Sequence, residues 1–437
     1  MQICISTANL LDFYAVVCYI SPMKSYIHRT LEKTVKKAAQ EFPVVLVTGP
    51  RQSGKTTLLQ HIFQPTHRFV YLDEPDLRTL AVEDPHLFMA QNPPPIVFDE
   101  IQYAPELLNY IKRDVDHHRH DKGRYILSGS QSFPLMQGVS ETLAGRISVL
   151  TLLSFSHAEK SFLPFANPFW KTDTELPQSE HSINGADFFS DMLRSGFPEL
   201  VIEPSRDIRL WMSAYIQTYL ERDIRNIRNI GSLTDFQRFL FALAARTSQL
   251  INISEIARDI GLTVNTVKAW FSILEASFQI VLLKPYYSNL GKRLVKSPKL
   301  YFLDPAIPAY LAGLEDAKHA FMGPMGGALF ENAVFAEIYR AFIHRGEAPR
   351  IFFWRTAMGH EVDFILDFGT HLIPVEVKLS ATPKKIFSKN LQKFGDLFPS
   401  LVHQSYLICL CSKSTYLTQN IIALPFQDIY PTTRSES

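Results

Sequence analysis

The residues with the clearest chemical potential form a glycine-rich run with fixed spacing. The run is Gly49-Pro50-Arg51-Gln52-Ser53-Gly54-Lys55-Thr56, and Thr57 follows it. This is the G-x-x-x-x-G-K-[ST] pattern of a P-loop, whose backbone N–H groups turn around a phosphate. The lysine of such a loop reaches the β- and γ-phosphates, and the hydroxyl after it binds Mg²⁺. A chain of this length matches the bare pattern by chance about one or two times in a hundred, so we expect residues 49–57 to bind ATP.

Two adjacent carboxylates, Asp99 and Glu100, follow the apolar run 96–98. Acids at the carboxyl end of a buried strand lie at the edge where an open α/β sheet binds its ligand. We expect Asp99 to hold the Mg²⁺ through water and Glu100 to act as the base that polarises the attacking water. The alternative is a pair of solvated acids at a strand end. No N-K-x-D guanine-reading motif occurs in the chain, which favours adenine.

Three further residues could take part in hydrolysis. Ser130 and Gln131 follow the apolar run 125–128 and could sense the γ-phosphate. Arg146, in the sequence Leu-Ala-Gly-Arg, could be an arginine finger that stabilises charge in the transition state. A surface salt bridge explains an isolated arginine equally well. The predicted catalytic residues are therefore Lys55, Glu100 and Arg146.

A second group of charged residues lies in the last third of the chain. Asp363 and Glu376-Val-Lys378 lie in two apolar segments, and residues 367–370 between them have the composition of a hairpin turn. Alternate residues of a strand share one face, so a hairpin can bring these three side chains together. Two acids and a lysine can bind Mg²⁺ and orient a water on a phosphodiester, with Glu331 as a further ligand. The alternatives are structural polar residues or a nuclease-like fold without activity.

The middle of the chain has the spacing of a helix-turn-helix motif. Ser254 is the expected N-cap of a first helix that ends at Gly261, and a second helix begins at Val264. Strands near 280–285 and 299–303 could form a wing. The residues that could contact DNA are Asn265, Thr266, Lys268, Lys292, Arg293, Lys296 and Lys299. Winged helices also serve as protein-interaction modules, and that alternative stays open.

These candidate residues need particular elements to position them. Apolar runs at 44–48, 68–72, 96–98, 125–128 and 147–152 alternate with helical stretches such as 56–63, which predicts a doubly wound parallel α/β sheet. Residues 164–187 lack periodicity and predict a long surface loop. Residues 206–312 are predicted to be mostly helical, and a helix at 328–342 precedes several further strands.

Composition limits the class of protein. The 437 residues are 46% hydrophobic and 20% charged with a net charge of +1, which is typical of a globular protein of two to four domains. Any DNA contact must therefore come from local basic patches. Four cysteines are too few for a disulfide scaffold, so we expect a cytoplasmic protein without a membrane partner. Residues 1–22 match neither a signal peptide nor a membrane span, and either Met1 or Met23 can be the start.

Together these motifs resemble a widespread family of prokaryotic AAA-type P-loop ATPases. In that family a winged helix and a C-terminal restriction-endonuclease-like domain of unknown function follow the ATPase domain. The most specific pieces are 47–57, 98–102, 143–146, 195–199 (Ser-Gly-Phe-Pro-Glu), 219–223 (Tyr-Leu-Glu-Arg-Asp), 361–364 and 376–378. The resemblance implies an α/β multidomain fold: an extension at 1–22, a P-loop doubly wound parallel sheet at 23–205, a helical winged-helix domain at 206–315, and a small α/β nuclease-like (PD-(D/E)xK) domain at 316–437.

The implied ligands are ATP and Mg²⁺. The leading hypothesis is an ATPase that uses ATP to control a DNA-binding, nuclease-like C-terminal half. An ATP-gated, Mg²⁺-dependent nuclease and a non-catalytic nucleotide-sensing scaffold are the alternatives. The expected partners beyond ATP are DNA, a second copy of the chain, or another protein.

Overall fold

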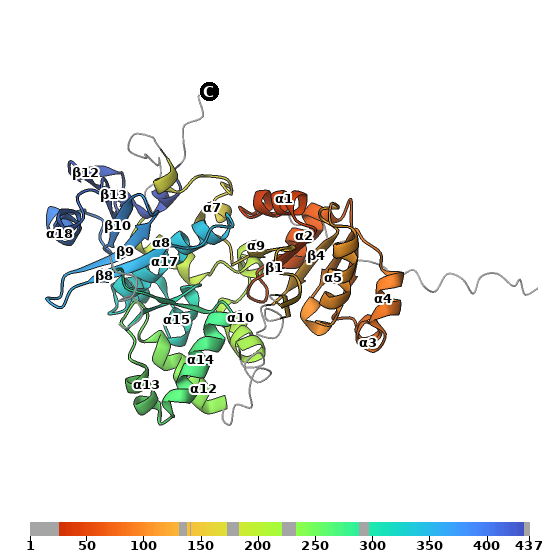
Figure 1. The fold of residues 1–437 in the computed structure, drawn as a ribbon. Coiled ribbons are helices and arrows are strands. Elements are labelled where there is room, and N and C mark those ends of the chain that lie inside the picture. Colours follow the sequence, from red (N-terminus) through yellow and green to blue (C-terminus); the bar gives the residue numbers. More distant parts are fainter. Residues whose placement is uncertain are drawn as a thin grey trace, which may run out of the picture.

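A computed structural model describes residues 26–130, 138–139, 141–172, 183–220, 233–287 and 297–431. Figure 1 shows a first α/β domain at one end of the molecule, in red to brown, and a second sheet at the other end, in blue. Helices of the middle of the chain, in green, lie below the junction between them. Gln131, Lys292, Arg293 and Lys296 lie outside the described residues, as does the segment 1–22.

The first domain is built on five parallel strands in the order β2-β3-β4-β1-β5. The strands are β1 (Val44–Thr48), β2 (Arg68–Tyr71), β3 (Ile96–Asp99), β4 (Tyr125–Gly129) and β5 (Ile147–Thr151). The helices are α1 (Glu32–Glu41), α2 (Lys55–Phe63), α3 (Pro75–Glu83), α4 (Pro85–Gln91) and α5 (Leu107–His117), and η1 (Ile101–Tyr103) follows β3. The predicted parallel α/β sheet is therefore confirmed.

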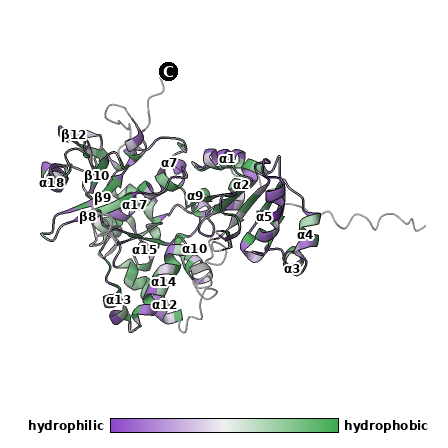
Figure 2. Cartoon of the chain, viewed as in Figure 1, coloured by the Kyte–Doolittle hydropathy of each residue, from purple (hydrophilic) through white to green (hydrophobic). Residues whose placement is uncertain are grey.

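The central strand β1 is buried on both faces because its apolar residues alternate between two cores. Val44 and Leu46 pack in a cluster with α5, whereas Val45 and Val47 pack in a cluster with α1 and α2. Figure 2 shows the resulting pattern, with hydrophobic strands inside and hydrophilic residues on the outer sides of α1 and α5. A continuous β-branched run is what such a doubly covered strand requires.

The segment after β5 leaves the first sheet and joins a different core. It contains α7 (His157–Lys160), η2 (Phe169–Lys171), α8 (Gly185–Leu193) and α9 (Pro198–Ile202). The prediction of a surface loop over 164–187 was wrong for its described part, because Phe169 is buried with its ring centroid 4.5 Å from that of Tyr406, and α8 begins at Gly185. The sequence did not predict this packing, because single aromatic side chains anchor the segment and isolated residues produce no periodic pattern.

The middle of the chain is mostly helical. Its elements are α10 (Ile208–Tyr215), a π-helix η3 (Ile216–Leu220), α12 (Leu233–Ala244), α13 (Ile253–Ile260), α14 (Val264–Ala276), β6 (Ile280–Leu283), β7 (Lys299–Phe302), α15 (Ala306–Leu311) and α16 (Ala317–Met322). Gly261 ends α13 with φ 73°, as its position predicted. The N-cap of α13 is Asn252 rather than Ser254, because the Asn252 side chain accepts hydrogen bonds from the N–H groups of Ser254 and Glu255.

The C-terminal part is a six-stranded sheet in the order β12-β13-β11-β10-β9-β8, packed on a long helix. The elements are α17 (Gly326–Ile343), β8 (Ile351–Arg355), β9 (Glu361–Asp367), β10 (Leu372–Val377), η5 (Lys385–Ser388), α18 (Lys389–Leu397), β11 (Ser405–Cys409), β12 (Thr415–Thr418), β13 (Ile421–Pro425) and η6 (Phe426–Ile429). β9 and β10 form the predicted antiparallel hairpin. No described helix is both long and apolar enough to cross a bilayer.

Candidate functional site

The P-loop connects β1 to α2 and depends on two glycines. Gly49 has φ 146°, and a Cβ on it would lie 2.1 Å from the backbone oxygen of Leu152. Gly54 has φ 91° and caps α2 in the left-handed conformation. No acidic residue lies in the first turn of α2, so its N-terminal dipole is not neutralised there. The loop therefore has the backbone shape and the positive potential that a phosphate requires.

Lys55 and Ser53 are both buried within this loop. The Lys55 ammonium donates hydrogen bonds to the carbonyl oxygens of Gly49 (3.2 Å) and Pro50 (2.9 Å). The Ser53 hydroxyl is fully buried and has no hydrogen-bond partner among the described residues. An orphaned hydroxyl and a buried cation inside a ring of backbone amides fit a bound polyphosphate.

Asp99 is linked to the P-loop by a direct hydrogen bond. The Thr56 hydroxyl donates to its Oδ2 at 2.8 Å, and the Ser128 hydroxyl donates to its Oδ1. Burial raises the pKa of Asp99 above its ordinary value, although these two hydrogen bonds oppose the shift. Ser128 was not singled out from the sequence, because a serine inside an apolar strand has no signal of its own. A threonine hydroxyl and an aspartate at this spacing are the residues that would hold Mg²⁺.

Glu100 lies at the end of β3 in a conformation unusual for a non-glycine residue. Its φ is 57° and its ψ 46°, which places it in the left-handed region. The Ser128 Oγ accepts a hydrogen bond from its N–H at 3.3 Å, and Gln102 donates to its carboxylate. Such backbone conformations persist where surrounding contacts hold them and cluster at functional sites. Glu100 is therefore held beside Asp99 with its carboxylate half-exposed.

A cavity of about 630 Å³ opens beside the P-loop. Its lining includes Tyr26, Gly54, Thr57, His61, Phe155 and Pro198. The rings of Tyr26 and His61 stack with centroids 3.8 Å apart. Ligand sites commonly enclose roughly 300–1,000 Å³ with aromatic walls, so the volume suits a nucleoside attached to phosphates in the loop.

Arg29 supports the P-loop from behind, and the sequence did not indicate this role. Its guanidinium donates to the backbone oxygens of Ser53 (2.9 Å) and Leu153 and lies 3.2 Å from Glu159. Burial alone would raise the pKa of Glu159, but Arg29 and His344 hold that pKa well below its usual range. His344 follows α17, so this buried network joins the P-loop to the C-terminal part.

The predicted arginine finger, Arg146, lies far from the P-loop of its own chain. It immediately precedes β5, and its carbonyl accepts from Val44 at the start of β1. β1 and β5 are parallel and five residues long. The P-loop follows β1, so it lies at the opposite ends of the strands, about 16 Å from Arg146. Arg146 instead forms a 2.6 Å ion pair with Asp116. Of the two candidate sensors, Ser130 lies half-buried just past β4, and Gln131 is outside the described residues.

The four residues predicted for the nuclease-like site do lie together. Lys378 donates to Glu376 at 2.6 Å, and the Val377 N–H donates to Asp363 at 2.9 Å, across the β9–β10 hairpin. Burial and repulsion by Asp363 raise the pKa of Glu331 to about 7 and that of Glu376 to about 8.

Lys299 enters this cluster and is therefore not the surface phosphate contact that was expected. It is 3% exposed and forms ion pairs with Glu331, Glu361 and Asp363. Strand β7 packs on α17, which turns the side chain inward. By contrast, Asn265 and Lys268 at the start of α14 are exposed, and Thr266 hydrogen bonds to the N-cap residue Thr263.

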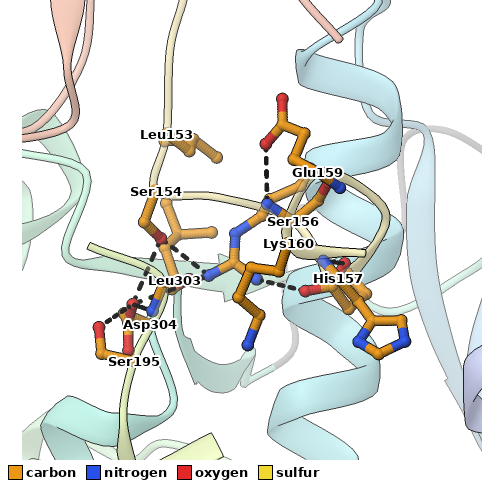
Figure 3. Close-up of polar contacts among 12 residues, drawn as sticks. Leu153, Ser154, Ser156, His157, Glu159, Lys160, Ser195, Leu303 and Asp304 are labelled. Carbon is orange, nitrogen blue, oxygen red and sulfur yellow. Dashed lines mark hydrogen bonds and ion pairs between the residues drawn. The ribbon is translucent and has the colours of Figure 1, made fainter. Parts of the chain in front are cut away.

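A second polar network lies where the three parts of the chain meet, and Figure 3 shows it. Asp304, just after β7, accepts hydrogen bonds from the Ser195 hydroxyl (2.7 Å), the Gly196 N–H (3.1 Å) and the Ser154 hydroxyl (3.3 Å). Arg340 on α17 donates to Ser154 at 3.0 Å. Ser195 and Gly196, the first two residues of the Ser-Gly-Phe-Pro-Glu piece at 195–199, therefore form hydrogen bonds between parts of the chain.

Comparison with known proteins covers most of the chain in three pieces. Residues 41–161 match a family described as an AAA domain, and residues 185–318 and 326–429 match two domains of unknown function, DUF8612 and DUF4143. Two uncharacterized proteins, of Mycobacterium bovis and Mycobacterium tuberculosis, are each 27% identical over 351 residues, which is 80% of this chain and 73% of theirs.

Two solved structures give weaker similarities. A Walker-type ATPase of Pyrococcus abyssi is 15% identical with a TM-score of 0.42, covering 66% of this chain and 97% of its own. The Orc1 protein of Aeropyrum pernix, solved with DNA, is 12% identical with a TM-score of 0.28, covering 66% and 93%. Scores this low do not establish a common fold. The AAA-domain match, together with the geometry of the P-loop, Asp99 and Glu100, supports an AAA-type P-loop ATPase.

Proposed function

We propose that this protein binds ATP with Mg²⁺ and hydrolyses it. The observation that carries the proposal is the 2.8 Å hydrogen bond from Thr56, in the first turn of α2, to Asp99 at the end of β3. It joins the P-loop to the acids at the end of β3 across 43 positions of sequence, which supports a nucleotide-hydrolysing site here. A bound Mg²⁺ would neutralise charge that develops on the phosphates.

Each side chain of the site has a distinct task. Lys55 is already inside the loop, so it can transfer its hydrogen bonds from the loop carbonyls to the phosphate oxygens. Thr56 and Asp99 would hold the metal ion. Glu100, fixed by its contacts with Ser128 and Gln102, orients a water and accepts its proton. The cavity beside Gly54 and Thr57 accommodates adenine against Tyr26 and His61.

The test separates binding from turnover. Lys55→Ala should weaken ATP binding by at least about tenfold, because a charge-assisted contact to phosphate is lost. Glu100→Gln should retain ATP affinity and lose phosphate release. Lys37→Ala is the matched control, because the Lys37 side chain is 74% exposed on α1 and lies 3.8 Å from Glu41. Unchanged ATP affinity in Lys55→Ala would show that the site lies elsewhere. Undiminished turnover in Glu100→Gln would show that another residue is the base.

DNA is the partner favoured for the middle domain. Asn265 and Lys268 are exposed at the start of α14, which follows the left-handed turn at Gly261 as the second helix of a helix-turn-helix motif would. Stimulation of phosphate release by duplex DNA, lost in the double variant Asn265→Ala, Lys268→Ala, would support a DNA-controlled ATPase. Turnover that DNA does not change would favour a protein partner. ATP binding without turnover would favour the non-catalytic nucleotide-sensing scaffold.

Arg146 can act as an arginine finger only on the nucleotide of a second copy. Two observations support this restriction to a second copy: Arg146 lies at the ends of the strands opposite its own P-loop, and it forms an ion pair with Asp116. If copies assemble in this way, Arg146→Ala reduces turnover without reducing ATP affinity. Mixing it with Lys55→Ala would then restore part of the activity, because each variant supplies what the other lacks.

A further inference from the structure

The acid cluster of the C-terminal part already contains a cation supplied by another part of the chain. Lys299 is the first residue of β7, and its Nζ lies 3.2 Å from Glu331 Oε1 and 3.7 Å from Asp363 Oδ1. It also pairs with Glu361. The Tyr301 hydroxyl, two residues along β7, donates to Glu331 at 2.6 Å. Three carboxylates from α17 and β9 therefore converge on one ammonium group.

The position of Lys299 is fixed by the backbone that carries it. Asn332, on α17, accepts from the Phe302 N–H and donates to the Phe302 carbonyl, both at 2.8 Å. The Thr247 hydroxyl donates to the same side chain. These contacts are buried, so strand β7 is held firmly against α17. Lys299 is consequently part of the packed interface and not a mobile surface lysine.

The cluster has one more acid than cations, and without Lys299 the excess of negative charge would double. Its four carboxylates are Glu331, Glu361, Asp363 and Glu376. Its cations are Lys299, Lys378 and, at the exposed edge, Arg355, which lies 3.0 Å from Glu361. Removing Lys299 would leave four acids facing two cations in a largely buried place, which is strongly unfavourable.

One acceptor of the cluster is unsatisfied. Glu376 is 4% exposed, and its Oε2 has no hydrogen-bond partner among the described residues, while Oε1 accepts from Lys378. A buried carboxylate oxygen without a donor marks a place where a further cation would be stabilised. That cation would face Asp363 as well, because Asp363 and Glu376 occupy neighbouring positions on paired strands.

A metal ion and the Lys299 ammonium cannot share these ligands. Both are positive, and the lysine already uses Glu331 and Asp363, two of the oxygens that a Mg²⁺ would need. Two like charges held by the same carboxylate oxygens repel strongly where little water screens them, and the metal brings a second positive charge. The residues as arranged therefore do not fit a resident Mg²⁺.

We propose that Lys299 takes the place of a metal ion in the nuclease-like acid cluster. The cluster then serves as a buried ion-pair contact between the middle and C-terminal parts of the chain. The same carboxylates can bind a divalent cation only when the Lys299 charge is removed. This inference is independent of the ATP site.

Manganese binding, followed by the electron paramagnetic resonance of free Mn²⁺ without nucleotide, tests the proposal. Lys299→Ala should bind one more Mn²⁺ per chain than the wild type. The double variant Lys299→Ala, Asp363→Asn should lose that ion, which assigns it to the cluster and not to the P-loop. Lys299→Arg retains the positive charge and should bind no more than the wild type.

Thermal unfolding keeps the test decisive if Lys299→Ala folds poorly. Mn²⁺ should raise the melting temperature of Lys299→Ala and leave that of the wild type unchanged, since only the variant has a vacant place for the ion. Equal Mn²⁺ binding by wild type and Lys299→Ala would overturn the proposal. So would a Lys299→Ala variant that neither gains an ion nor is stabilised by one.

Discussion

The guanidinium of Arg29 donates a 2.9 Å hydrogen bond to the backbone carbonyl of Ser53, inside the P-loop. The same side chain pairs with Glu159, which in turn contacts His344 after α17. The loop is thereby connected to the C-terminal part through three buried side chains.

Arg29→Met should lower stability by about 3–5 kcal/mol, because it leaves the buried Glu159 with one charged partner fewer. It should also weaken ATP binding, since the Ser53 carbonyl loses its donor. Adding Glu159→Gln removes the stranded charge, so the double variant should recover part of the stability but none of the ATP affinity. Urea unfolding and ATP titration measure the two effects. Affinity that recovers together with stability would show that Arg29 acts on the fold alone.

Ser128→Ala should reduce turnover by roughly 10–100-fold while ATP affinity changes little, because Ser128 orients Asp99 and Glu100, the residues that we propose hold the metal and the water. Its hydroxyl contacts both Asp99 and the Glu100 N–H. Ser148→Ala, on strand β5, is the control with the same chemical change. Steady-state phosphate release distinguishes them, and equal rates for the two variants would exclude this role.

Gly49→Ala should abolish ATP binding. Its Cβ would lie 2.1 Å from the Leu152 backbone oxygen, and its φ of 146° is unfavourable for alanine. The comparison is Gly313→Ala, where φ is 71° but, apart from its chain neighbours, no atom of the described residues lies within 4 Å of the new Cβ. That change should cost about 1 kcal/mol of stability and leave ATP affinity intact. Measurable ATP binding by Gly49→Ala would mean that the loop tolerates another shape.

Asp304→Ala should destabilise the protein by roughly 3 kcal/mol, because its carboxylate satisfies three donors at the junction of the domains. Asp316→Ala removes an exposed N-cap whose side chain accepts from the His319 N–H and should cost about 1 kcal/mol. Denaturant unfolding compares the two. Similar losses would show that the network around Asp304 adds little.

The stability of the protein should depend on Glu159 in acid. Burial would raise the pKa of this carboxyl, but Arg29 and His344 lower it below the unfolded value. A carboxyl of this kind stabilises the fold above its unfolded pKa and loses that contribution as pH falls through the folded pKa. Between about pH 5 and pH 3 the wild type should therefore lose more stability than Glu159→Gln. Parallel pH profiles, measured by urea unfolding, would contradict this.

Local sequence determined the strand–loop–helix unit of the P-loop, the acids at the end of β3 and the β9–β10 hairpin. In each case the deciding interactions lie within a few residues: glycine backbone freedom, helix initiation and strand alternation. The convergence of Asp363, Glu376 and Lys378 was predictable for the same reason, since one short turn joins their strands.

Tertiary structure alone decided the partners of Arg29, Ser128, Lys299 and Arg146. Arg29 meets Leu153 across 124 positions, and Lys299 meets the acids of α17 and β9 because strand β7 packs on that helix. The parallel pairing of β5 with β1 placed Arg146, which precedes β5, at the end of the strands away from its own P-loop. Periodicity records which face of an element is buried, but not which charged group of another element will lie opposite it.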